Sequence, residues 1–108
     1  MSEQPETRIQ KAIVKHLKKL GGHARKVHGS AYSAGEPDID ACIAGRSVKL
    51  EVKVPGKKPT PLQLAVLRKW QKAGALAGWV TSLEDVDDLL SFRVRGPGWR
   101  NPQLEVEQ

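Results

Sequence analysis

Strict alternation of apolar and charged residues over positions 47–54 constrains the fold of this chain more than any other feature. The even positions carry Val, Leu, Val and Val, and the odd positions between them carry Lys, Glu and Lys. Because successive side chains of a strand point to opposite faces of a sheet, the pattern predicts a strand with one buried face and one charged face. A second strand-like run, 37–43, comes just before it, and Ala44-Gly45 predicts a tight connection between the two strands.

Helical spacing of apolar residues predicts a helix over residues 5–20. Four aliphatic residues from Ile9 to Leu20 recur three or four positions apart, which places them on one face. Pro5 suits the first turn of such a helix, and Gly21-Gly22 is typical of its end.

The remaining segments alternate between strand and helix. Weak alternation over 23–28 predicts a short strand. The Thr-Pro-Leu-Gln sequence at 60–63 combines a cap, a first-turn proline and a glutamine three residues after the cap, so a helix is expected from there to Gly74. A strand over 76–81 and a short acidic helix over 82–90 follow. This order predicts an α/β fold in which helices flank a mixed sheet with a central hairpin.

The 108-residue chain has no internal repeat, no low-complexity tract and no linker long enough to divide it, so we expect one domain over residues 1–108. The tail 96–108 begins with several Pro and Gly residues and is expected to be irregular, with Trp99 attaching it to the body. No apolar run reaches membrane-spanning length, and no basic region followed by an apolar stretch opens the chain. We therefore expect neither a membrane span nor a secretory signal.

The single cysteine, Cys42, cannot form an internal disulfide. It lies among strand-like residues, and we expect it to be buried as a small hydrophobe in a reducing compartment, the cytoplasm. A catalytic thiol is the alternative, but no feature around Cys42 supports it.

Positive charge is concentrated in the part of the chain that carries these patterns. The net charge is +6; residues 1–80 have 15 Lys and Arg against 6 Asp and Glu, whereas residues 81–108 have 3 against 6. A basic field of this kind attracts polyanions, chiefly nucleic acid. A merely soluble basic surface fits the composition equally well.

The charged face of the hairpin brings two carboxylates and an amine together. If the connection is centred on Ala44-Gly45, the numbers of opposed residues sum to 89, so Asp38 lies opposite Glu51 with Cβ atoms roughly 5 Å apart. Lys53 projects from the same face. Two carboxylates this close repel each other unless a lysine or a divalent cation compensates, and hard cations such as Mg²⁺ prefer carboxylate oxygens. The alternative is an exposed hairpin with cross-strand ion pairs.

Glu6 falls within the apolar face of the first predicted helix, three residues before Ile9. A carboxylate that points inward is unfavourable without a partner, which favours a third metal ligand delivered from the helix onto the sheet. The alternative is that Glu6 only complements the helix dipole.

Several polar residues have more than one interpretation. Gln63 is explained by the capping box, but the chain after Lys53 returns its helix to the edge where the charged face lies, so Gln63 can also serve that face. The three histidines show no metal-ligand spacing and are expected at the surface, near phosphate if they have a role: His16, His23 and His28. Basic residues able to hold backbone phosphates are Arg8, Lys11, Lys15 and Lys18 in the first helix, Lys57 and Lys58 in the following loop, and Arg68 and Lys72 in the second helix.

Together these residues resemble the virus-type replication–repair nuclease domain, VRR-NUC, of the PD-(D/E)xK superfamily. The matching elements are Glu6, Gly-x-Pro-Asp at 35–38, Glu-x-Lys at 51–53 and Thr-x-x-Gln at 60–63. The resemblance spans roughly Glu6 to Val80, most of the chain, and the order and spacing of the four elements make it fairly specific, although each element alone is not. It implies a restriction-endonuclease-like core, a mixed sheet flanked by helices.

The resemblance also implies hydrolysis of DNA phosphodiester bonds with Mg²⁺ or Mn²⁺ as cofactor. The lysine of the motif would orient the attacking water or offset developing charge, and the glutamine would support both. By position, the implied metal ligands are Asp38, Glu51, Glu6 and the carbonyl oxygen of Val52, and the other catalytic residues are Lys53 and Gln63.

Stand-alone members of the family resemble Holliday junction resolvases. The resemblance therefore implies a homodimer acting on branched DNA, such as four-way junctions or flaps, in a bacterial or phage-infected cell. Trp70, Trp79 and Trp99 are large enough to belong either to the core or to such an interface. The alternative function is a nucleic-acid-binding module without catalysis. The intact acidic pair argues against it, because carboxylates repel phosphate unless a metal intervenes.

Overall fold

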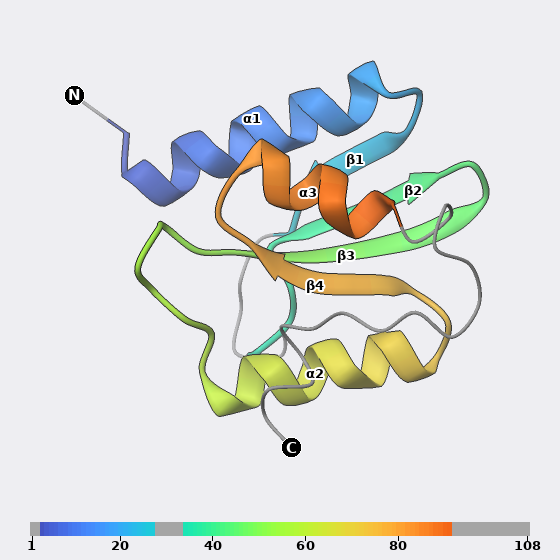
Figure 1. Cartoon of the computed structure of the whole chain (residues 1–108). Coiled ribbons are helices and arrows are strands. Elements are labelled where there is room, and N and C mark those ends of the chain that lie inside the picture. Colours follow the sequence, from blue (N-terminus) through green and yellow to red (C-terminus); the bar gives the residue numbers. More distant parts are fainter. Residues whose placement is uncertain (1–2, 28–33, 92–108) are drawn as a thin grey trace.

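The predicted hairpin forms the centre of a four-stranded sheet (Figure 1). The computed structural model of the chain describes residues 3–27 and 34–91. In their order across the sheet, the strands are β1 (His23–Lys26), β2 (Ile39–Ile43), β3 (Arg46–Val52) and β4 (Leu76–Val80). The pairs β1–β2 and β2–β3 are antiparallel and β3–β4 is parallel, so the sheet is mixed, as predicted.

The turn between β2 and β3 sets the register of the hairpin. Ala44 has φ 50° and Gly45 has φ 82°. Left-handed values at both central positions are required by the type I′ turn, whose twist matches that of the strands it joins. The paired residues run from Ile43 with Arg46 to Ile39 with Leu50, so their numbers sum to 89, as predicted.

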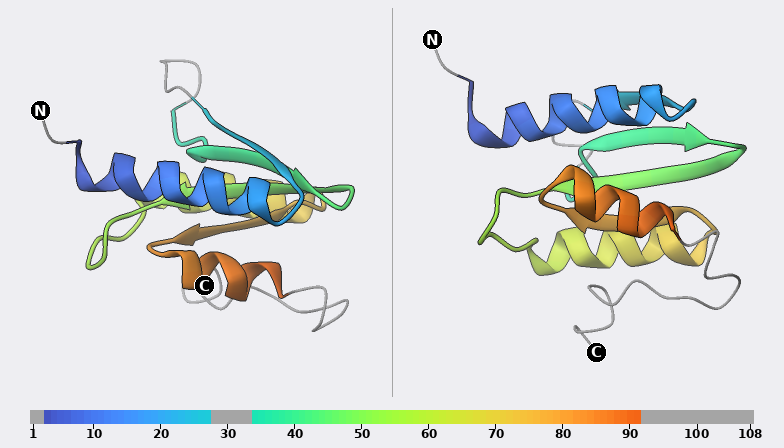
Figure 2. Two further views of the ribbon diagram at one scale, coloured as in Figure 1. Left: turned by 90° about the horizontal axis from the view of Figure 1, so that it is seen from above. Right: turned by 45° about the horizontal axis from the view of Figure 1, so that its top comes forward.

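Three helices cover the two faces of the sheet (Figures 1 and 2). The first, α1 (Pro5–Lys19), and the last, α3 (Leu83–Leu90), pack on one face, and α2 (Pro61–Lys72) packs on the other. Their bounds agree closely with those predicted from periodicity and caps. The helix α2 begins with the predicted capping box, and Ser82 caps α3 by accepting a hydrogen bond from the Asp85 N–H.

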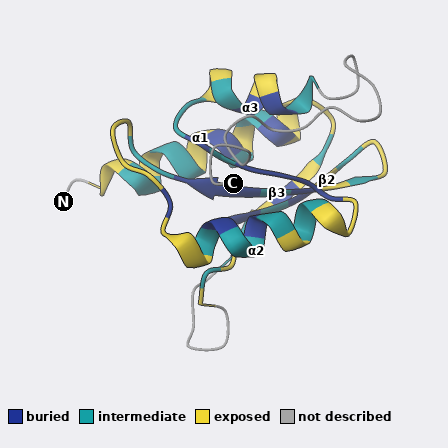
Figure 3. Cartoon of the chain, turned by 60° about the horizontal axis from the view of Figure 1, so that its bottom comes forward, coloured by how far each residue is buried: buried dark blue, intermediate teal, exposed yellow. Residues whose placement is uncertain are grey.

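Alternation along β3 puts the main core on one side of the strand. Figure 3 shows the buried residues along β3. Val48, Leu50 and Val52 are completely buried and belong to one cluster with Ile13 and Leu17 of α1. The buried face of α3 completes this cluster. The other face of β3 is therefore left for polar side chains, as the alternation predicted.

A smaller apolar cluster lies between α2 and the other face of the sheet. Leu64 and Leu67 of α2 pack with Ala77 of β4, and Trp70 and Trp79 are partly buried against them. Both tryptophans therefore contribute to the core of the monomer itself.

Cys42 is exposed, so the expectation of a buried cysteine is wrong. Ala41 faces the main core, and the next residue of a strand points the opposite way. On that opposite face α2 contacts β3 and β4 and does not extend over β2, so Cys42 and its cross-strand partner His23 both face solvent.

His16 lies at the surface, as expected, but it also has a partner there. It is half-buried, and its Nε2 lies 2.7 Å from Asp87 Oδ1, so that it links α1 to α3. Three further predictions, on His28, Trp99 and the irregular tail 96–108, lie outside the described residues. None of the helices in the described ranges is long and apolar enough to cross a membrane.

Candidate functional site

Three carboxylates meet where the ends of α1, β2 and β3 converge, and we call them the acidic cluster. Glu6 comes from the first turn of α1, Asp38 immediately precedes β2, and Glu51 lies next to the last residue of β3. One oxygen of each lies within 4.8 Å of the others. Within residues 3–27 and 34–91, no other group of three or more acidic, histidine or cysteine side chains is gathered in this way.

Asp38 is held by backbone groups on both sides. Its carbonyl oxygen accepts a hydrogen bond of 2.7 Å from the Val27 N–H, and its Oδ2 accepts one of 2.8 Å from the Val52 N–H. The first bond ties Asp38 to the end of β1 and the second turns its carboxylate toward β3. Asp38 is therefore fixed beside Glu51, as the hairpin register predicted.

Glu51 is the only buried charged side chain among the described residues, with 1% of its surface exposed. Its Oε1 is shielded from solvent and has no hydrogen-bond partner in the described part of the chain. Burial, and then the neighbouring charge of Asp38, raises the pKa of Glu51 to about 8, while Lys53 opposes this rise only in part. An ionised carboxylate in such a place requires a further positive partner.

Lys53 projects toward the acidic cluster, as predicted. Its Nζ lies 3.6 Å from Glu51 Oε2. Its backbone N–H donates a hydrogen bond of 3.0 Å to the carbonyl oxygen of Val80 at the end of β4. The neighbouring strand thus holds the backbone from which the lysine side chain leaves the sheet.

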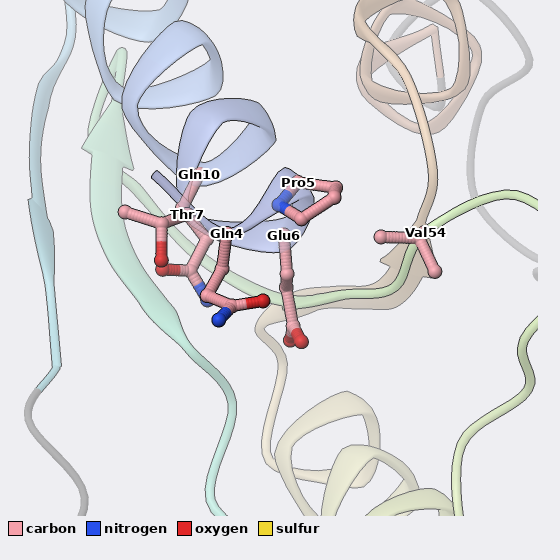
Figure 4. Close-up of a pocket in the computed structure, with 6 residues that line it drawn as sticks. All are labelled: Gln4, Pro5, Glu6, Thr7, Gln10 and Val54. Atoms are coloured by element: carbon pink, nitrogen blue, oxygen red, sulfur yellow. The ribbon is translucent and has the colours of Figure 1, made fainter. Parts of the chain in front are cut away.

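Glu6 extends from α1 toward the strand ends, with Val54 across from it (Figure 4). The side chain is half-buried, and its place in the acidic cluster confirms the inward direction predicted from the apolar stripe. A hollow of about 450 Å³ opens beside Glu6, which is the member of the acidic cluster that lines it. Its other lining residues are Gln4, Pro5, Thr7, Gln10 and Val54.

The acidic cluster fits a hard divalent cation. Such cations prefer carboxylate oxygens and bind each at about 2.0–2.6 Å, so oxygens within 4.8 Å of one another can share one ion. The unpartnered Oε1 of Glu51 supplies an independent indication, since a buried acceptor without a donor is rare. One lysine cannot balance three carboxylates, whereas the lysine and a doubly charged ion together can.

The segment that carries Asp38 rests on α2. Gly35 has φ 81°, and a Cβ at this position would lie 2.8 Å from the Leu62 side chain, so a larger residue would push the segment off the helix. Next to it, Glu36 Oε2 accepts a hydrogen bond of 2.9 Å from the indole nitrogen of Trp70. No sequence pattern pointed to this contact, because Glu36 and Trp70 belong to segments that meet only in the folded chain.

The same face of the hairpin carries a pair of opposite charges two positions along the strands from Asp38 and Glu51. Asp40 faces Lys49, and its Oδ1 lies 2.5 Å from the ammonium group, which also lies 4.2 Å from the ring centre of Trp70. Arg25 of β1 adds a contact of 3.5 Å to the other oxygen of Asp40. The alternative of cross-strand ion pairs is thus correct at this step of the ladder, but it does not describe the acidic cluster.

Comparison with known proteins agrees with this geometry, although no family profile matches the sequence. A phage protein named "Putative nuclease p44", from Acyrthosiphon pisum secondary endosymbiont phage 1, is 37% identical over 83 residues, which are 76% of this chain and 85% of the relative. A solved structure described as a VRR_NUC domain is 33% identical and superposes with a TM-score of 0.70 over 82% of this chain and 97% of its own.

The chain belongs to the VRR-NUC family. A second solved structure, described as a VRR_NUC domain protein, is 18% identical with a TM-score of 0.65 over 88% of this chain and 92% of its own, and it supports the fold. The restriction-endonuclease-like arrangement expected from the resemblance, a mixed sheet flanked by helices, is therefore confirmed.

Gln63 occupies the capping box of α2 in this VRR-NUC domain. Its Oε1 accepts a hydrogen bond of 2.9 Å from the Thr60 N–H, and its own N–H donates one of 3.2 Å to Thr60 Oγ1. The capping interpretation is confirmed. A role of Gln63 in catalysis stays a prediction.

The basic residues predicted to bind DNA lie on two separate surfaces of the VRR-NUC domain. Those of α1 lie on the side of the sheet opposite to α2. The first surface carries Arg8, Lys11, Lys15 and Lys18; the second carries Lys57 and Lys58 in the loop before α2, with Arg68 and Lys72 on α2 itself.

Proposed function

We propose that this VRR-NUC domain is a metal-dependent endonuclease that hydrolyses DNA phosphodiester bonds. One observation carries the proposal: Glu51 is buried with an unpartnered oxygen inside a group of three carboxylates. Like charges gathered in this way destabilise a fold unless a cation neutralises them. The kinship with VRR-NUC domains and with a phage protein named as a nuclease supports the same function.

We assign the metal site to Glu6, Asp38 and Glu51, with the carbonyl oxygen of Val52 as a further ligand. The set is made of oxygens alone, which suits Mg²⁺ or Mn²⁺. When bound, the cation supplies positive charge to the scissile phosphate and lowers the pKa of a water molecule. The bond from the Val52 N–H keeps Asp38 in place for this task.

Lys53 acts on the water and the phosphate in this proposal. Its ammonium group lies beside the cluster, where it can orient the attacking water and stabilise the negative charge that develops on the phosphate oxygens. The oxygen of water bonds to phosphorus, the P–O bond to the leaving strand breaks, and a proton from the water ends on the leaving oxygen, so that one new end carries a phosphate and the other a hydroxyl. We assign Gln63 a supporting role through its amide nitrogen, because its Oε1 is engaged in the cap.

Incubation of the 108-residue protein with labelled DNA tests the proposal. Linear duplex, flap and four-way junction DNA are each incubated with Mg²⁺, with Mn²⁺ and with EDTA. Cleavage is expected with either metal and not with EDTA, and Asp38→Ala, Glu51→Ala and Lys53→Ala should each abolish it while DNA binding persists. Asp40→Asn is the matched control, because Asp40 lies on the same strand and face but in the neighbouring ion pair.

Full cleavage in EDTA, or undiminished cleavage by Asp38→Ala, would refute the metal-dependent mechanism. Metal-independent binding without any cleavage would instead establish the nucleic-acid-binding module that the sequence left as the alternative.

We further propose that the protein acts as a symmetric homodimer on branched DNA. One domain of this size with one acidic cluster cuts one strand, and a two-fold dimer is the simplest way to make two related cuts. The family resemblance supports this proposal; Trp70 and Trp79 do not, because they pack inside the monomer. Sedimentation equilibrium decides it: an 11.9 kDa species both alone and with a saturated four-way junction would rule out the dimer.

A further inference from the structure

A groove between α1 and the edge strand β1 gathers lysines from both elements. Its volume is about 300 Å³. Four lysines and a valine line it, and no carboxylate does: Lys11, Val14, Lys15 and Lys18 of α1, and Lys26 of β1. We call this hollow the basic groove.

Most of the positive charge in the basic groove is uncompensated. Lys15, Lys18 and Lys26 form no ion pair with any residue in the described ranges. Like charges lining one hollow repel each other, so taking up an anion relieves that repulsion. The aliphatic wall provided by Val14 and the lysine stems suits a chain of alternating phosphates and sugars.

Glu3 lies outside the lining of the groove and pairs with one of the lysines that line it. Its carboxylate forms an ion pair with Lys11 just before α1 begins. The hydrogen bond from Lys11 lowers the pKa of Glu3, and the charges of Arg8 and Lys26 add to the effect. The ammonium group of Lys11 thus holds a carboxylate, which has the same single negative charge as a phosphodiester.

The two elements that line the groove, α1 and β1, also bear on the acidic cluster. Lys26 is followed by Val27, whose N–H holds the backbone of Asp38 at 2.7 Å. On α1, Lys11 follows Glu6 by five residues, a rise of about 7.5 Å along the helix, although its side chain leaves α1 about 140° around the axis from that of Glu6. A nucleic-acid backbone lying in the groove would therefore reach the metal site within a few nucleotides.

We propose that the basic groove binds the sugar–phosphate backbone of a DNA strand next to the cleavage site, and that Glu3 occupies one phosphate position until that strand displaces it. The proposal rests on the proposed function in taking DNA as the ligand. It adds Lys26 and Glu3 to the binding site and selects α1 with β1, not α2, as the surface along which the strand lies.

Removing lysines from the groove tests the first part. Binding of fluorescein-labelled duplex DNA is followed by anisotropy in EDTA, where no cleavage is expected, over a range of salt concentrations. Lys15→Ala combined with Lys26→Ala should reduce the magnitude of the log-affinity versus log-salt slope by about 1.8, or about 0.9 for each lost phosphate contact. Lys19→Ala combined with Lys69→Ala is the matched control, since both are exposed lysines outside the groove, and it should leave the slope nearly unchanged.

Removing the internal anion tests the second part. Glu3→Gln should tighten DNA binding and steepen the salt slope by up to about 0.9, because the strand no longer competes with a resident carboxylate. Glu84→Gln on α3 removes the same charge from an exposed position outside the groove and should change the slope little.

The outcomes distinguish a failure of the proposed DNA-binding groove from a failure of the proposed nuclease activity. Equal slopes for the groove variant and its lysine control, or no measurable DNA binding at low salt, would overturn the groove. Equal effects of Glu3→Gln and Glu84→Gln would overturn the role of Glu3. If the groove variants weaken binding as expected but the wild-type protein cuts no DNA with any metal, the groove stands and the proposed nuclease fails.

Discussion

Two neighbouring cross-strand pairs of β2 and β3, on the same face of the sheet, differ in their charge balance. We call each pair a step of the β2–β3 ladder. At one step Asp40 meets Lys49, and the pair is completed by Arg25 and by the ring of Trp70. At the next step Asp38 lies beside Glu51, two like charges whose single nearby ammonium group does not compensate them.

The difference shows how a small domain separates stability from function. The first step needs nothing from outside and stabilises the hairpin. The second is destabilising when both carboxyl groups are ionised, and a cation that binds there must displace the proton that the raised pKa of Glu51 retains, so cation binding should strengthen as the pH rises toward 8.

Glu51→Gln should have the largest effect: it should lower metal-supported cleavage and raise the stability of the metal-free protein at pH 8. Metal-supported cleavage should fall by about 10²–10³-fold, because a charged ligand is lost. Without metal, wild-type stability should decline as pH rises from about 4.5 to about 8, because the raised pKa means that the folded state binds a proton that the unfolded chain has already lost. Removing this penalty should make the variant more stable than wild type at pH 8 by about 2–4 kcal/mol.

Thermal unfolding in EDTA at pH 5 and pH 8 measures this effect, with Mn²⁺ added in a parallel series. Wild type should regain stability with Mn²⁺ at pH 8, and the variant should not. If the variant is less stable than wild type at pH 8 without metal, Glu51 does not carry the strain assigned to it.

Asp40→Asn, at the step where opposite charges pair, should lower stability and leave the response to metal unchanged. It leaves the partly buried ammonium group of Lys49 without its nearest carboxylate, so the free energy of unfolding should fall by about 1–3 kcal/mol. The response of the melting temperature to Mn²⁺ should stay as in wild type. Loss of that response would mean that the two steps are one coupled site.

Glu6→Gln should weaken metal-supported cleavage about tenfold and leave the melting temperature nearly unchanged. The residue reaches the cluster from the first turn of α1, where its charge adds to repulsion and where no buried hydrogen bond depends on it in the described contacts. Cleavage rates against Mn²⁺ concentration provide the measurement. A variant that cuts normally and is only less stable would make Glu6 a helix-dipole residue.

Trp70→Phe should have the smallest effect. It keeps an aromatic ring in the small cluster but removes the hydrogen bond to Glu36, which is worth about 0.5–1.5 kcal/mol. If this bond helps to position Asp38, the Mn²⁺ concentration needed for half-maximal cleavage should rise a few-fold. Trp79→Phe is the matched control from the same cluster, and equal effects of the two changes would show that α2 only supports the core.

Sequence patterns predicted the structural features that depend on residues close together in the chain. Alternation and the turn at Ala44-Gly45 predicted the register that joins Asp38 to Glu51, and helical periodicity predicted that Glu6 points inward. These features follow from fixed periods of 2 and 3.6 residues, which a sequence displays directly.

What the sequence could not predict depends on how far one element extends over another. Cys42 is exposed because α2 stops short of β2, and the apolar character of its neighbours says nothing about that limit. The bond between Glu36 and Trp70 and the lysine groove between α1 and β1 likewise require the packing of distant segments.

The two-residue turn also bears on the order in which the site assembles. Asp38 and Glu51 belong to one hairpin, so its closure brings them together in about 1–10 μs, whereas Glu6 arrives only when α1 docks. Contacts between near neighbours in sequence form before contacts between distant ones. Repulsion between Asp38 and Glu51 therefore arises early in folding. A proton or a cation held at Glu51 should raise the folding rate as well as the stability of the folded state.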